Sequence, residues 1–86
     1  MEEQPILITE EWIRNNNFIS FNEDGQLIYW YKYEEDFHIY LHPLTNPYDQ
    51  NKPYYKIEVK APREGYYGFC STLEEYNRVI EFFYYH

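Results

Sequence analysis

The stretch QLIYWYKYEEDFHIYLH, residues 26–42, predicts two β-strands joined by a tight acidic turn. Residues 26–33 are rich in β-branched and aromatic residues, which favour strands, but rings occupy both alternating faces. The inward face of this strand is therefore left open. In residues 37–42, Phe, Ile and Leu alternate with His and Tyr, which predicts an apolar face toward the core and a polar aromatic face toward solvent.

Shorter signals of the same kind lie on both sides of this stretch. Alternation and turn residues predict further strands over 18–21, 55–61 and 66–70, with turns at 22–25 and 62–65. In the first turn, Gly25 stands where a positive φ is needed. Residues 43–53 hold three prolines and form the longest predicted loop.

Two helices are predicted, one near each end of the chain. The first spans residues 9–16, with Thr9 as N-cap and the asparagines 15–17 as the stop, because Asn tolerates the left-handed conformation. The second begins with a capping box in which Ser71 is the N-cap and Glu74 reaches back. Its apolar stripe has helical spacing and consists of Leu73, Tyr76, Ile80 and Phe83.

These elements predict one α+β domain over residues 1–86. We expect an antiparallel meander of about four to five strands, since most connections are tight turns. A short N-terminal helix and a longer C-terminal helix are expected to cover one face of the sheet.

The composition is dominated by aromatic rings and acidic residues. The 86 residues include 12 Tyr, 6 Phe and 2 Trp, and 15 acidic residues against 7 Lys and Arg give a net charge of −8. A domain this small cannot bury so many rings, and Tyr and Trp suit contact surfaces as well as cores. The composition therefore predicts a protein partner, and a basic one is compatible with the charge.

The same charge argues against direct binding of nucleic acid or of an anionic membrane, because the basic residues are few and scattered. Lys56 and Lys60 share a predicted strand face, but Glu58 lies between them on that face. The chain start has no signal-peptide pattern, and no run is long and apolar enough for a membrane span. With Cys70 as the single cysteine, a reducing cytoplasm is the expected location.

No catalytic, cofactor-binding or metal-binding residue is predicted. His38 and His42 share a strand face but lie about 13 Å apart, too far for one ion, so surface histidines are favoured over a metal site. Cys70 precedes a helix N-terminus, which would lower the pKa of a nucleophilic thiol. No base motif accompanies it, so a small half-buried core residue is favoured.

We expect the interaction surface to combine partly exposed rings with carboxylates. Tyr66 and Tyr67 are further rings that we expect to be partly exposed, whereas core filling and cross-strand pairing account for most of the others. Which rings cluster depends on which face of the sheet the helices cover. The candidate residues are Trp30, Tyr40, Tyr48, Tyr54, Glu34, Glu35 and Asp36.

The segment Ile8–Ile13, ITEEWI, followed by Phe18, resembles the opening "L-T-E-E-W-L-x-x-F-G-F" of small proteins from Bacteroidetes genomes and their phages. The glycine of that pattern corresponds to Asn17, and Asn16 replaces its second-to-last Phe. The resemblance covers about a tenth of the chain in letters. It implies a small α+β fold and a phage or mobile-element setting, and it transfers no site residue.

Three function classes follow. The first is a non-enzymatic interaction module, whose sharper form inhibits a host defence protein through carboxylates that stand in for DNA phosphates. The second is a self-associating structural subunit, a homodimer for example, that buries rings of residues 82–86 between copies. The third, an enzyme, is disfavoured because no motif supports it. We predict the first.

Overall fold

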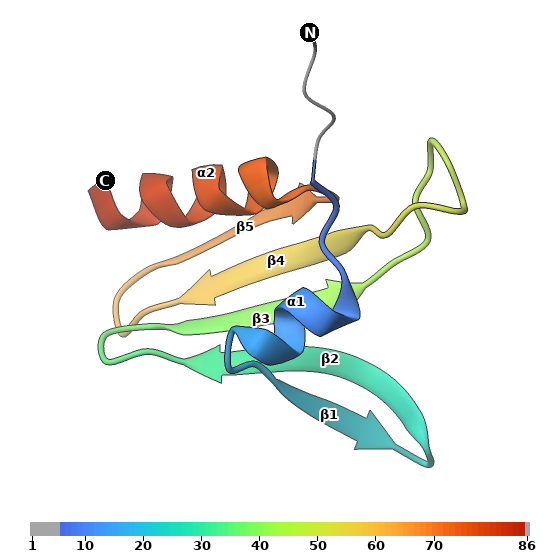
Figure 1. Ribbon diagram of the computed structural model, residues 1–86. Helices are drawn as coiled ribbons and strands as arrows, with labels where there is room; N and C mark the ends of the chain where they lie inside the picture. Colours follow the sequence, from blue (N-terminus) through green and yellow to red (C-terminus); the bar gives the residue numbers. More distant parts are fainter. Residues whose placement is uncertain (1–5, 86) are drawn as a thin grey trace, which may run out of the picture.

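The structure is a computed structural model that describes residues 6–85, with the side chains of residues 6–82. It confirms the α+β prediction, with five strands between two helices (Figure 1). In chain order the elements are α1 (Glu10–Asn15), β1 (Ile19–Glu23), β2 (Gln26–Tyr33), β3 (His38–Pro43), β4 (Tyr55–Lys60), β5 (Gly65–Cys70) and α2 (Leu73–Tyr85).

The five strands form one antiparallel meander in the order β1-β2-β3-β4-β5. The turn between β1 and β2 uses Asp24 at φ 53° and Gly25 at φ 79°, so the predicted positive φ at the glycine is confirmed. Two consecutive residues with positive φ match the twist of the strands that they join. The register slips by one residue between Phe21 and Asn22.

Helix α1 begins and ends as the sequence indicates. The Thr9 hydroxyl accepts a hydrogen bond from the Trp12 N–H at 3.1 Å, as expected of an N-cap. After the helix, Asn17 adopts φ 68°, the left-handed conformation that reverses the chain. The chain then returns to the sheet through Phe18, which is buried in the core and lies one residue before β1.

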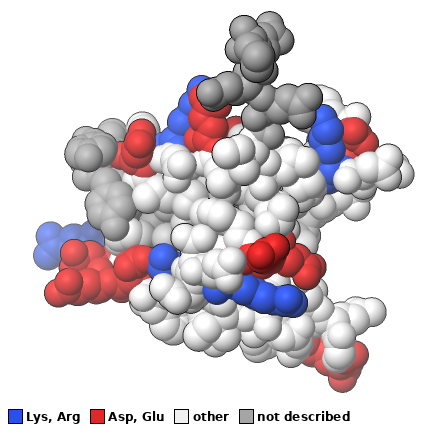
Figure 2. Space-filling model, in the orientation of Figure 1, with Lys and Arg blue, Asp and Glu red and all other residues white. Residues whose placement is uncertain are grey.

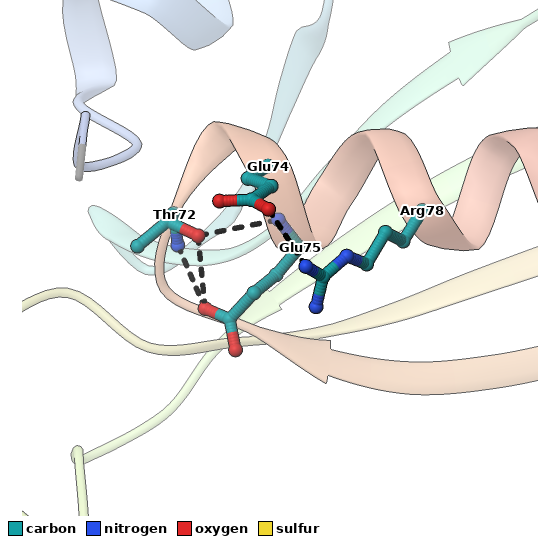
Figure 3. Close-up of polar contacts among 4 residues, drawn as sticks. All are labelled: Thr72, Glu74, Glu75 and Arg78. Atoms are coloured by element: carbon teal, nitrogen blue, oxygen red, sulfur yellow. Dashed lines mark hydrogen bonds and ion pairs between the residues drawn. The ribbon is translucent and has the colours of Figure 1, made fainter. Parts of the chain in front are cut away.

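The capping box of α2 lies one residue later than predicted (Figure 3). Glu75, not Glu74, reaches back, and its Oε1 accepts hydrogen bonds from the N–H groups of Ser71 and Thr72, both at 3.0 Å. The Thr72 hydroxyl accepts the Glu75 N–H at 3.2 Å, so Thr72 is the cap. The prediction of Ser71 was wrong because its hydroxyl donates to the Pro53 carbonyl at 2.7 Å and its own carbonyl accepts the Ile8 N–H.

Both helices pack on the same face of the sheet, as predicted. In Figure 1, α2 runs along β5 and α1 lies over β2 and β3. Trp12 on α1 meets Tyr76 on α2 edge to face, with ring centroids 5.1 Å apart. The core between helices and sheet is formed by Ile8, Ile13, Phe18, Trp30, Phe37, Ile39, Leu41, Tyr55, Ile57, Val59, Cys70 and Tyr76.

Helix α2 approaches the sheet closely at Gly68. A Cβ at this position would lie 3.3 Å from Cγ2 of Val79, so the glycine gives the helix room. The residues of the predicted α2 stripe that the structure describes lie against the core, and Tyr76 is the buried one. Phe83, the last member of the stripe, lies outside the described side chains.

Candidate interaction surface

The side of the sheet opposite the helices is covered by no other element of the described chain, and we call it the open face. Cross-strand partners share a face, so the register identifies its residues. Tyr31 pairs with Tyr40, Tyr40 with Glu58, and Glu58 with Tyr67. By this register the rings of the open face are those of Phe21, Tyr29, Tyr31, Tyr33, His38, Tyr40, His42, Tyr67 and Phe69.

On β1, β2 and β3 these rings form one connected cluster. Phe21 stacks on Tyr29 with centroids 4.9 Å apart and planes 13° apart. Tyr29 contacts Tyr40 edge to face at 5.6 Å, and Tyr33 lies 4.3 Å from His38. The rings of the cluster differ in solvent exposure: Tyr29 is partly buried, whereas Tyr33 is 63 % exposed. The rings therefore hold each other in place while their edges meet solvent.

A second, smaller ring cluster lies over β5. The ring of Tyr54, just before β4, stacks on Phe69 with centroids 5.8 Å apart and planes 7° apart. Phe69 meets Tyr67 edge to face at 6.2 Å. Tyr67 is 61 % exposed and Phe69 is 47 % exposed. These two rings are among the most accessible apolar side chains of the open face.

A charged row on β4 separates the two clusters. Glu58 accepts from His42 Nε2 at 2.7 Å and lies within 4 Å of both lysines, at 3.9 Å from Lys56 Nζ and 3.8 Å from Lys60 Nζ. Each ammonium also lies 5.1 Å from a ring centroid, Lys56 over Tyr67 and Lys60 over Tyr40. Each lysine thus has a cation–π contact and shares one carboxylate, which balances one of the two positive charges.

This row corrects the expected acidic character of the surface. On the described strands of the open face, Glu58 is the carboxylate among the rings, and two lysines accompany it. The other described carboxylates lie on the helices, in the turns and at the strand ends. Figure 2, in the orientation of Figure 1, shows acidic and basic side chains next to each other in several small groups, with uncharged areas between the groups.

Trp30 does not belong to the surface, contrary to our expectation. It pairs with Leu41 across β2 and β3, which turns its ring toward the helices and leaves it 3 % exposed. The Arg14 guanidinium lies 5.6 Å from the ring centroid. The indole N–H of Trp30 is buried and has no hydrogen-bond partner among the described residues. Trp30 is therefore a core residue.

The structure places the other candidate tyrosines at separate points. Tyr40 lies at the centre of the open face, where burial and the neighbouring Tyr33 raise the pKa of its phenol. Tyr54 lies in the β5 cluster. Tyr48 is 90 % exposed in the loop before β4, whose backbone is held by the side chain of buried Asn46. Tyr40 and Tyr54 therefore lie on the open face, and Tyr48 lies beyond one end of the sheet.

The candidate carboxylates lie at the opposite end of the sheet from Tyr48. Glu34, Glu35 and Asp36 form the turn between β2 and β3, whereas the loop with Tyr48 joins β3 to β4. Glu34 pairs with Lys32 at 3.1 Å. The seven candidate residues thus do not form one patch. Two lie on the open face, one lies in the core, and four lie beyond the two ends of the sheet.

Tyr66 and Tyr67, both expected to be partly exposed, lie on opposite faces. Tyr66 pairs with Val59 on the helix side, and its ring lies 4.9 Å from that of Phe82 on α2. Of the run 82–86 expected to associate between copies, the side chain of Phe82 is described and is 47 % exposed. The rest of that run lies outside the described side chains.

The groups considered for chemistry have ordinary structural roles. His38 and His42 flank Tyr40 on the open face, in contact with its ring. In the described part of the chain, no three His, Cys, Asp or Glu side chains gather as a metal site would require. Cys70 is fully buried, and this burial raises the pKa of its thiol to about 12. The expected lowering by the helix N-terminus is thus outweighed.

Several open-face rings were missed as candidates, among them Tyr29, Tyr31, Tyr33 and Phe69. The signal that could have found them is the short turn after β2. The clean alternation in β3 turns Leu41 inward, and antiparallel pairing across this turn sets Trp30 opposite Leu41. The tyrosines at odd positions of β2 must then face outward.

Between residues 6 and 85, no helix combines the length and the apolar character that crossing a membrane requires. Comparison of the chain with protein-family models, curated proteins and solved structures found no match.

Proposed function

We propose that the protein is a non-enzymatic interaction module that binds a protein partner through the rings of its open face. The observation that supports this most strongly is the pair of ring clusters on the uncovered side of the sheet. The side chains of Tyr33, Tyr67 and Phe69 are exposed to solvent on this side. Tyrosine and phenylalanine are common anchors of protein interfaces, and contiguous exposed apolar patches mark contact sites.

The arrangement of the rings suits binding more than it suits folding alone. The rings are stacked or edge to face, so little side-chain freedom is lost when a partner covers them. In the row on β4, both lysines lie within 4 Å of the Glu58 carboxylate, so neither ammonium would be covered without an opposite charge beside it. The proposal includes a cytoplasmic location, because Cys70 is the single cysteine.

The phage setting implied by the N-terminal resemblance stays a prediction. The form of the hypothesis in which carboxylates imitate DNA phosphates receives no support from the open face, where lysines accompany the one carboxylate. We therefore propose that the activity of the protein is binding of a protein partner through the aromatic rings of the open face.

The test is comparative capture from cells that naturally express the protein. The bait is the full chain, either wild type or with Tyr33→Thr, Tyr67→Thr and Phe69→Thr. Threonine is chosen because it keeps the strand propensity. The control is Phe82→Ala, which removes an exposed ring from the helix side.

The proposal predicts a protein that wild type and the control capture and that the triple variant loses. Capture that is equal for all three baits, with the triple variant folded by circular dichroism, would contradict it. Self-association is the alternative, and it predicts that the lost protein is the chain itself.

A further inference from the structure

A cavity lies at one end of the open face. It has a volume of about 270 Å³ and lies where the turn after β2 meets the turn after β4. Glu35, Asp36, His38 and Lys60 line it together with the apolar Phe37 and Pro62. His38 belongs to the ring cluster through Tyr33, so the cavity continues the open face.

The cavity has more negative than positive charge available to a ligand. The Lys60 ammonium is engaged by Glu58 at 3.8 Å and by the Tyr40 ring at 5.1 Å. The carboxylates of Glu35 and Asp36 have no ion-pair partner within residues 6–82. Their charges are therefore free to pair with a cation that enters the cavity.

The volume selects the kind of cation. Pockets for drug-sized ligands begin at roughly 300 Å³, so this cavity suits a single side chain better than a cofactor. Apolar walls beside carboxylates match the apolar stem and charged head of Arg or Lys. A side chain that reaches this cavity from a partner on the open face needs no separate path, because His38 borders both.

We infer that the cavity receives an arginine or lysine side chain of the partner that covers the rings. This inference rests on the proposed function and names the partner's chemistry: an apolar or aromatic segment with a basic residue at the end near Glu35. Charge complementarity supports this inference, because rings occupy the middle of the open face and the carboxylates of Glu35 and Asp36 lie at its end, where a basic side chain would pair with them.

A second copy of the chain fits this description poorly. The net charge is −8, and most described basic side chains are already engaged, Arg14 by Glu10, Lys32 by Glu34 and Arg78 by Glu74. The other end of the face also carries carboxylates in the turn between β1 and β2. Two copies face to face, each with a net charge of −8, would therefore repel each other.

The experiment uses three capped probe peptides, Trp-Arg-Trp, Trp-citrulline-Trp and Trp-Glu-Trp, titrated into the isotope-labelled full chain. Amide chemical shifts are followed by NMR. We expect saturable shifts at residues 35–38 and on the open face with the arginine peptide, and weaker binding of the citrulline peptide, which lacks the charge. Glu35→Gln with Asp36→Asn should weaken the arginine peptide about threefold to tenfold, as expected for two partly exposed ion pairs.

The matched control is Glu10→Gln with Glu11→Gln, which removes the same charge from α1 and should leave binding unchanged. Equal binding of the arginine and citrulline peptides would overturn the inference, and so would equal losses in the two charge variants. If those results came with ring-dependent capture, the proposed function would still stand. Tighter binding of the glutamate peptide, or shifts that depend on the concentration of the chain itself, would assign the face to another occupant and also overturn the inference.

Discussion

Replacing Glu75 by alanine tests the observed start of α2. The change removes three hydrogen bonds at the cap, from the N–H groups of Ser71 and Thr72 and from the Thr72 hydroxyl, at 3.0 to 3.1 Å. The cap is exposed, so water replaces part of the loss. We expect unfolding free energy to fall by about 1 kcal/mol, the usual value of a helix cap. For a domain of this size that lowers Tm by roughly 4–8 °C.

Glu74→Ala is the control, because it removes the same side chain from the neighbouring position. Its loss is the exposed pair with Arg78 at 2.6 Å, worth roughly 0.3–0.5 kcal/mol and partly offset by the helix propensity of alanine. Both variants are measured by urea unfolding with circular dichroism. If Glu74→Ala lowered the free energy of unfolding as much as Glu75→Ala or more, the observed cap would be refuted. The result would then favour the predicted capping box of Ser71 and Glu74.

The same pair of variants predicts a pH dependence. Partial burial alone would raise the pKa of Glu75, but hydrogen bonds from Ser71 and Thr72 outweigh it and hold the pKa below its ordinary value. A lowered pKa in the folded state means that the carboxylate stabilises the protein above its unfolded pKa. The difference between wild type and Glu75→Ala should therefore be full at neutral pH and shrink as pH falls below about 4.5. A difference that grows on acidification would contradict this sign.

Three further predictions follow from packing. Gly68→Ala should destabilise by about 1 kcal/mol, because the new Cβ meets Val79 at 3.3 Å, and Gly68→Ala should cost less in a Val79→Ala background; additive costs in urea unfolding would show no such contact. Cys70 should resist alkylation in the native protein at pH 8 and react in denaturant, since its thiol is buried with a pKa of about 12, and rapid native labelling would contradict this. Tyr67→Thr on the open face should cost under about 1 kcal/mol, whereas Ile57→Ala in the core should cost about 2–5 kcal/mol; similar costs would mean that the open face is not open.

Local signals predicted most of the fold because each acts over a few residues. Thr9 caps α1, Asn17 takes the left-handed conformation, and the alternation after the acidic turn sets the inward face of β3. Tight turns between most successive strands then leave the meander as the simplest order. Each of these features depends only on residues that are close together in the sequence, so it can be predicted without the structure.

The errors came from contacts between distant segments. Ser71 has the right residue type for a cap, but its hydroxyl is engaged by Pro53, which lies 18 positions earlier in the chain. The start of α2 is thus decided by the loop before β4. Trp30 looks like a surface anchor in isolation and becomes a core residue through its pairing with Leu41.

Net charge was a poor guide to the character of the open face. The value of −8 is a sum over the molecule, whereas a contact depends on the charges beside it. The alternation of Lys56, Glu58 and Lys60 already placed two lysines and one carboxylate on one side of β4. Which side the helices leave uncovered could be decided only by combining this alternation with the register of all five strands.

Binding of a partner on the open face can be tested by placing a photo-crosslinking residue at position 67 instead of Tyr67, in cells that express the protein. The comparison is the same residue in place of Asn77, which is exposed on α2. We predict a discrete protein adduct from position 67 and none from position 77. Adducts from position 77 alone, or from neither position in folded protein, would contradict the claim.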